Sequence, residues 1–245
     1  MIEVNDIVEL RKIIDEFKIP LEEIKIGKQL TELDWLFCDV YSIKGSISNW
    51  DVSHVTNMRC MFYNSYVSQD ISGWNIHNVK DMSYIFEGAN FNKDISEWDV
   101  SNVTNMEGMF ADSIFNKDIS EWDVSNVEDM KYMFYDSKFN KDISKWNVSN
   151  VINMEGMFAH SKFKKDISKW NVSNVTNMRH MFHESKFNND ISRWNVSNVV
   201  NMSNMFVDSI FNKDISKWDV SNVVYYIDVF NNYPIKKEYK PKFDF

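Results

Sequence analysis

The chain has 245 residues, which is long enough for one domain or a short repeat array with a sizeable core. The composition is 44% hydrophobic and 15% aromatic, which excludes a disordered chain, and the low count of six Gly excludes a collagen-like or glycine-rich calcium-binding repeat. The formal net charge of −9 argues against nucleic acid as a partner, because an acidic chain repels phosphate groups. No apolar run approaches the roughly 18 residues of a membrane helix, so no membrane span is expected.

Residues 1–49 are predicted to form an N-terminal cap. Residues 5–18 predict an amphipathic helix with Asn5 as its N-cap, and a degenerate repeat unit follows it. The apolar face of this helix consists of Leu10, Ile13, Ile14 and Phe17.

Trp recurs every 24 residues from Trp50 to Trp218 without an insertion. Seven complete units therefore cover residues 50–217. The unit that begins at Trp98 reads WDVSNVTNMEGMFADSIFNKDISE. One such unit cannot bury enough apolar surface to offset the loss of chain entropy, so the units are expected to stack.

Each unit predicts one helical turn and one strand. The apolar residues from Val103 to Phe110 are spaced like one face of a short helix or 3-10 turn, and residues 118–124 are rich in β-branched and aromatic side chains. We therefore expect the α/β class, as a right-handed solenoid with one short parallel strand plus one short helical turn per 24-residue repeat.

Residues 218–245 are predicted to hold a partial repeat, a C-terminal cap and a tail. Tyr225 and Tyr226 interrupt the apolar pattern of the units, and the chain then becomes polar around Pro234 and Pro241. Such a change is typical of the terminal layer of a repeat array.

The repeated residues resemble a known family. The unit is similar to the repeat of BspA-like leucine-rich-repeat bacterial surface proteins and of related mycoplasma lipoproteins, over about residues 50–230. The resemblance implies a leucine-rich-repeat-like solenoid with a role in adhesion or protein binding. The residues that carry it are Val103, Met106, Met109, Phe110, Ser113, Phe115, Asp118, Ile119, Ser120 and Trp122.

Two polar columns recur in the units and are expected to be structural. Asn side chains in such a column satisfy backbone groups of their own and the next coil. Stacked carboxylates repel one another, so the Asp column needs turn amides and adjoining Lys as partners, with a calcium ladder as the alternative. The predicted ladder comprises Asn102, Asn126, Asn150, Asn174, Asn198, Asp118, Asp142 and Asp166.

Columns that vary between units are the candidates for partner binding. The residue before each Trp changes from acidic to basic along the chain, and we expect it to face water on the strand. Exposed Tyr is typical of binding hot spots. The candidate residues are Glu97, Glu121, Lys145, Lys169, Arg193, Lys217, Tyr84, Tyr132, Tyr63 and Tyr135.

No cofactor or metal site is predicted. His160, His180 and His183 lie in neighbouring units and could share a metal, but the expected role is that of solvated side chains, because no Cys or carboxylate spacing completes a ligand set. Cys38 and Cys60 fit no metal-ligand pattern and are expected to be reduced.

The predicted function is a non-catalytic protein-interaction or adhesion module that presents an extended sheet surface. A binder of glycans or another repeating polymer is the alternative, and an enzyme is not expected, because an active site would break the repeat at one place. The N-terminal residues lack the pattern of a secretory signal, which favours the cytoplasm. The family resemblance favours the cell surface or secretion instead.

Overall fold

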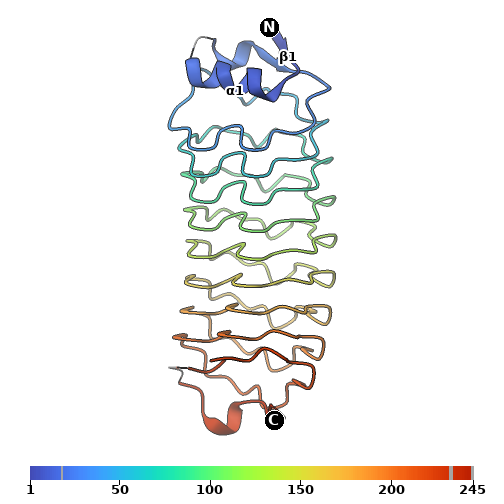
Figure 1. The fold of residues 1–245 in the computed structure, drawn as a ribbon, viewed down its shortest axis with the longest axis vertical. Helices are drawn as coiled ribbons and strands as arrows, with labels where there is room; N and C mark the ends of the chain where they lie inside the picture. The colour runs from blue at the N-terminus through green and yellow to red at the C-terminus, as the bar shows by residue number, and fades with distance from the viewer. Residues whose placement is uncertain (18, 232–233, 244–245) are drawn as a thin grey trace.

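The computed structural model describes residues 1–17, 19–231 and 234–243. The chain winds through successive coils that stack along one axis, with the two termini at opposite ends (Figure 1). Among the described residues, all named helices and strands lie in the two end caps. They are β1 (Ile2–Val4), α1 (Ile7–Glu16), the 3-10 helix η1 (Leu21–Glu23), β2 (Ile24–Ile26) and the 3-10 helix η2 (Lys237–Tyr239).

The core is a set of apolar columns that run through the stack. Phe134 is fully buried and stacks on Phe110 and Phe158 of the adjacent coils, with ring centroids 5.9 and 5.7 Å apart. Val127, Met130 and their equivalents are equally buried. Each coil therefore covers the apolar residues of the next, as expected for units that cannot fold alone.

The Trp column joins the coils through a polar bond as well as through burial. The indole Nε1 of Trp146 donates to the carbonyl oxygen of Ile119, which precedes the previous Trp, at 3.0 Å. The seven indoles from Trp74 to Trp218 make this bond at 3.0–3.2 Å, and that of Trp50 donates to the Leu21 carbonyl at 2.9 Å. Because the carbonyl is buried, this donor satisfies a group that water cannot reach.

The expected helix does not form, although turn bonds of the 3-10 type, such as that from the Met109 amide to the Met106 carbonyl at 3.2 Å, close within the segment. The reason lies in the direction of the amides between them. Met106, Gly108, Phe110 and Asp112 donate their amide hydrogens to carbonyl oxygens of the following coil at 2.7–3.0 Å. In an α-helix these amides would bond within their own segment. The segment forms consecutive turns instead, with φ of +59° at Gly108 and +51° at Asp112.

The strand expected at residues 118–124 is also wrong. The Ser120 amide donates to Asp118 Oδ1 at 3.0 Å, and the Trp122 amide donates to the Ile119 carbonyl at 3.2 Å. Asp thus closes a local turn that competes with strand pairing. In place of a sheet, one parallel bridge per coil forms elsewhere in the unit, such as that between Asn105 and Asp129, so the α/β description of the repeats does not hold.

The N-terminal cap contains more structure than the pattern predicted. Asp6, not Asn5, is the N-cap of α1, and its Oδ1 accepts hydrogen bonds from two amides of the first turn. Phe17 adopts a left-handed conformation beyond the helix end and is 45% exposed, so it leaves the predicted apolar face. The predicted end at Lys18 lies outside the described residues. The parallel pairing of β1 with β2 was not predicted.

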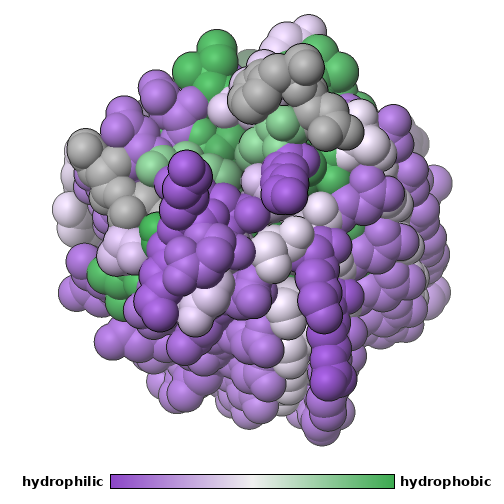
Figure 2. All heavy atoms as spheres, turned by 90° about the horizontal axis from the view of Figure 1, so that it is seen from below, coloured by the Kyte–Doolittle hydropathy of each residue, from purple (hydrophilic) through white to green (hydrophobic). Residues whose placement is uncertain are grey.

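The C-terminal end is only partly covered. The Ile215 amide donates to the Tyr239 carbonyl at 3.0 Å, and the ring of Phe243 stacks on Tyr226 at 5.2 Å. Val224 and Ile227 are 63% and 69% exposed. Figure 2 views this end and shows hydrophobic residues on the end face with hydrophilic rows along the sides.

Replacing Trp146 by Phe tests the indole bond. The substitution keeps most of the apolar contact but leaves the buried Ile119 carbonyl without its donor. We expect the free energy of unfolding to fall by about 1–3 kcal/mol, measured by guanidinium denaturation. The matched control is Trp35→Phe, at an indole that is 45% exposed, where the change should stay within about 0.5 kcal/mol. Equal losses in both variants would contradict a special role for the Nε1 bond.

Candidate functional site

The Asn column connects each coil to the preceding one. Asn126 Nδ2 donates to the Ser101 carbonyl oxygen and Asn150 Nδ2 to that of Ser125, both at 2.7 Å. His54 takes the place of Asn in the first unit, with its Nε2 2.9 Å from the Gly27 carbonyl oxygen. The same bond, at 2.7–2.8 Å, is made by Asn78, Asn102, Asn174, Asn198 and Asn222.

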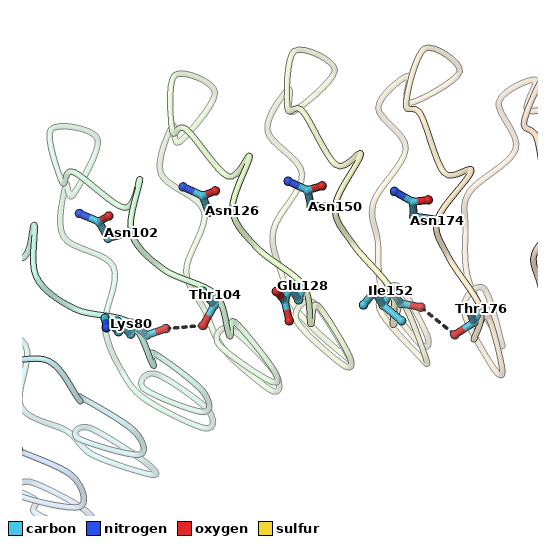
Figure 3. A pocket seen from close by; sticks show the side chains of 9 residues that line it. All are labelled: Lys80, Asn102, Thr104, Asn126, Glu128, Asn150, Ile152, Asn174 and Thr176. Carbon is cyan, nitrogen blue, oxygen red and sulfur yellow. Dashed lines mark hydrogen bonds between the residues drawn. The ribbon is translucent and has the colours of Figure 1, made fainter.

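A groove of about 670 Å³ runs across several coils beside these amides. One wall is the Asn column, and the other is a column of varied side chains that we call the groove column (Figure 3). Ile152 in this column is 47% exposed. The groove column comprises Lys80, Thr104, Glu128, Ile152 and Thr176.

The groove combines a fixed wall with a variable one. The Asn side chains are held at equal intervals by backbone bonds and point in one common direction (Figure 3). Among the groove residues, Thr104 Oγ1 donates to the Lys80 carbonyl and Thr176 Oγ1 to the Ile152 carbonyl, both at 3.4 Å. The groove can therefore offer regular polar contacts along one side and position-specific contacts along the other.

The residues before each Trp, the charged column, do not line this groove. They are exposed as predicted but lie on turns rather than on a strand. Lys145 Nζ lies 2.6 Å from Glu121 Oε1 where the column changes sign, and this hydrogen bond raises the pKa of Lys145. The exposed members are Glu97, Glu121, Lys145, Lys169, Arg193 and Lys217.

The Asp column closes local turns. Asp142 Oδ1 accepts from the Ser144 amide at 2.9 Å, and Asp166 Oδ1 from the Ser168 amide at 2.8 Å. The hydrogen bond from the Ser120 amide lowers the pKa of Asp118, and the charge of Lys141 lowers it further. Turn amides thus offset the repulsion between successive carboxylates.

The four Tyr candidates are half-buried rather than exposed. The ring of Tyr84 lies against Gly108 of the next coil so closely that a Cβ there would overlap it, and Tyr132 lies against Gly156 in the same way. Tyr135 packs edge-on against Tyr132, with centroids 5.7 Å apart, and Tyr63 packs against Trp35 at 5.8 Å. Part of each side chain therefore serves packing between coils.

The structure brings two of the three predicted histidines together with a carboxylate. His160 and His183 lie within 4.8 Å of Glu184, measured between the nitrogen and oxygen atoms that could hold a metal. His180 packs against His183 but is not part of this group, and Glu184 was missed in the sequence. Aligning the units would have found Glu184, because it occupies the same repeat position as His160 one unit later.

Neither cysteine resembles a reactive thiol. Both are free, and Cys60 is buried. Burial raises the pKa of Cys38 to about 11, so this group is protonated at neutral pH.

Replacing Gly108 by Ala tests the packing of Tyr84. Alanine is disfavoured at a φ of +59°, and its Cβ would overlap the Tyr84 ring, so the free energy of unfolding should fall by more than about 1 kcal/mol. In a Tyr84→Ala background the overlap disappears, and the additional cost of Gly108→Ala should decrease. Gly73→Ala is the control, since nothing lies within 4 Å of its Cβ. Equal costs of Gly108→Ala in both backgrounds would show that the ring and the glycine do not interact.

Glu87 provides a test of pH dependence. Burial, with the charges of Asp112 and Glu107, raises the pKa of Glu87 to about 7. A carboxyl whose folded pKa exceeds its unfolded value destabilises the protein once it ionises, so stability should fall as the pH rises from about 4.5 through 7. Glu87→Gln should flatten this slope and stabilise the protein at pH 8 more than at pH 5, as measured by thermal unfolding at both values. A gain that is the same at both values would contradict the shifted pKa.

No helix among the described residues has the length and apolar character needed to cross a membrane.

Comparison with known protein families matches residues 5–111, 64–162 and 159–239 to one family. The three overlapping matches cover nearly the whole chain, as expected for a repeat protein. Neither curated proteins nor solved structures give a match. The chain therefore belongs to the family described as Mycoplasma protein of unknown function, DUF285.

Proposed function

We propose that this chain is a non-catalytic binding module that holds a protein partner along the groove beside the Asn column. The observation that carries the proposal is the groove itself, which crosses several coils and has one regular and one varied wall. A surface of this kind suits an extended partner, because each coil adds a contact at a fixed interval.

The groove column supplies the chemistry for selecting a partner. Lys80, Glu128 and Ile152 offer a cation, an anion and an exposed apolar side chain in successive or nearby coils. These side chains can change without disturbing the bonds that hold the coils together. The proposed partner is therefore a protein segment with complementary charge and one apolar anchor.

A glycan or another repeating polymer is the second candidate. The Asn column favours it, since identical amides recur at the spacing of the coils. A ligand with a matching repeat could use the same contact in every coil. Nucleic acid fits less well because the chain carries a net charge of −9.

The finer assignment of the fold is part of the same proposal. We infer that the coils form a right-handed, leucine-rich-repeat-like solenoid related to the BspA-like surface proteins, on the strength of the repeated Val, Met, Phe and Trp positions. An adhesin at the cell surface and an adaptor in the cytoplasm both fit a binding module. Protease treatment of intact producer cells separates these two compartments.

Reversal of the groove chemistry tests the binding site. The variant Glu128→Arg with Ile152→Arg should lower affinity for a protein partner captured from the producer's lysate at least about 10-fold. The matched control, Val8→Arg with Glu9→Arg, makes the same change on the exposed face of α1 and should bind normally.

A second pair of variants locates the contact. Charge reversal of Lys145, Lys169 and Arg193 tests the charged column, and the same reversal of Lys138, Lys162 and Lys186 is its control on another exposed column. Loss of binding in the charged-column variant alone would contradict the groove as the main site. If the chain binds glycans on an array, loses that binding in the groove variant and captures no protein from the lysate, the polymer is favoured.

A further inference from the structure

His160 and His183 come from adjacent coils and converge with Glu184 on one side of the stack. His160 Nδ1 lies 3.2 Å from Glu184 Oε2, and His183 Nε2 lies 3.4 Å from Glu184 Oε1. The three ligand atoms lie within 4.8 Å of one another. We propose that these three side chains form a binding site for a divalent transition metal, of which Zn²⁺ is the best match.

The distances suit zinc. Zn²⁺ bonds His nitrogen and carboxylate oxygen at about 2.0–2.2 Å in tetrahedral geometry, which places neighbouring ligand atoms about 3.3–3.6 Å apart. The two His–Glu distances of 3.2 and 3.4 Å are close to this separation, but they end on different oxygens of the carboxylate, so Glu184 must turn or bind through both oxygens. Only small side-chain movements are then needed to bring all three atoms onto one ion.

The backbone holds the ligands in place. The His160 amide donates to the His183 carbonyl oxygen at 2.7 Å, and the Glu184 amide donates to that of Val207 at 2.8 Å. These bonds tie the coil of each ligand to its neighbour. The backbone of each ligand is therefore fixed before a metal arrives.

His160 and Glu184 share one repeat position, whose backbone conformation is unusual for Glu but not for His. His160 and Glu184 have φ of +56° and +50°, and Glu is rarely found in this left-handed region. A non-glycine residue there costs of order 1 kcal/mol. At the same position other coils have residues that tolerate this conformation, namely Asn64, Gly88, Asp112, Asp136 and Asp208.

The ring of His183 is positioned by its neighbours, which leaves Nε2 facing Glu184. Its Nδ1 is buried and has no hydrogen-bond partner among the described residues. The ring is held by edge-on contacts with His160 and His180, at 5.1 and 5.3 Å between centroids. Packing, rather than a polar partner of Nδ1, thus sets the orientation of the ring.

The chemistry of the ligands selects the class of metal. Two imidazoles and one carboxylate favour Zn²⁺ and its neighbours in the transition series, whereas Ca²⁺ and Mg²⁺ require more oxygen ligands. The negative charge of Asp208 acts on His183 and would further attract a cation. Three protein ligands leave one tetrahedral position for water.

Calorimetric titration of chelator-treated protein with ZnSO₄ tests the site. We expect one equivalent to bind, with no comparable binding of CaCl₂ or MgCl₂. His160→Ala, His183→Ala and Glu184→Gln should each weaken zinc binding by more than about 10-fold. The matched control is His77→Ala, because His77 Nδ1 lies 2.7 Å from Asp99 Oδ2 in an exposed His–carboxylate pair outside this group.

Two further measurements make the result decisive. Co²⁺ bound at the site should give the visible absorption of a tetrahedral complex, which His183→Ala should abolish. Unfolding midpoints without metal should show that each variant is folded. The proposal is overturned if the wild type does not bind one equivalent of zinc. It is also overturned if the folded His160→Ala and His183→Ala variants bind zinc as tightly as the wild type.

Discussion

The structure depends on the fact that every coil needs its neighbours to satisfy its backbone. In the repeats, alternate amides donate to the following coil, while the Asn side chains and the Trp indoles donate to the preceding one. The direction of these bonds is the same in successive coils, so the peptide groups cannot close into helices within one unit. Apolar burial then adds to an arrangement that hydrogen bonding has already restricted to one register.

This constraint separates the residues that build the stack from those that can vary. The positions that face the core, and the Asn and Trp whose side chains bond the preceding coil, recur with little change, because their loss leaves a cavity or an unpaired carbonyl between two coils. The groove column, the charged column and the His160–Glu184 group lie outside that set. Binding chemistry can therefore change from coil to coil while the scaffold stays constant.

The sequence predicted the repeat units and the buried columns, because strict Trp spacing and fixed apolar positions require stacking. It did not predict the local conformation. The spacing from Val103 to Phe110 fits a helix face and also fits turns whose amides point to the next coil, and apolar periodicity alone cannot distinguish these two. The strand predicted at residues 118–124 failed for a related reason. β-branched and aromatic residues favour a strand, but here the Asp118 side chain accepts a hydrogen bond from the Ser120 amide and closes a turn instead.

The candidate sites were likewise predicted only in part. The charged column is exposed as predicted, and its role in binding stays a prediction. The Tyr residues were misjudged, since the contact of Tyr84 with Gly108 joins residues one unit apart and appears only when the coils are superimposed. The sequence did not indicate Glu184 as a metal ligand, because the ligands of a site that spans two coils are not close together along the chain.

Amide hydrogen exchange resolved by residue tests the central claim most directly. The amides of Met106, Gly108, Phe110 and Asp112 should exchange slowly, because each donates to the following coil. Their equivalents in the central units should be protected to a similar degree. Fast exchange at these alternate amides in otherwise folded protein would contradict a stack held together by bonds between coils.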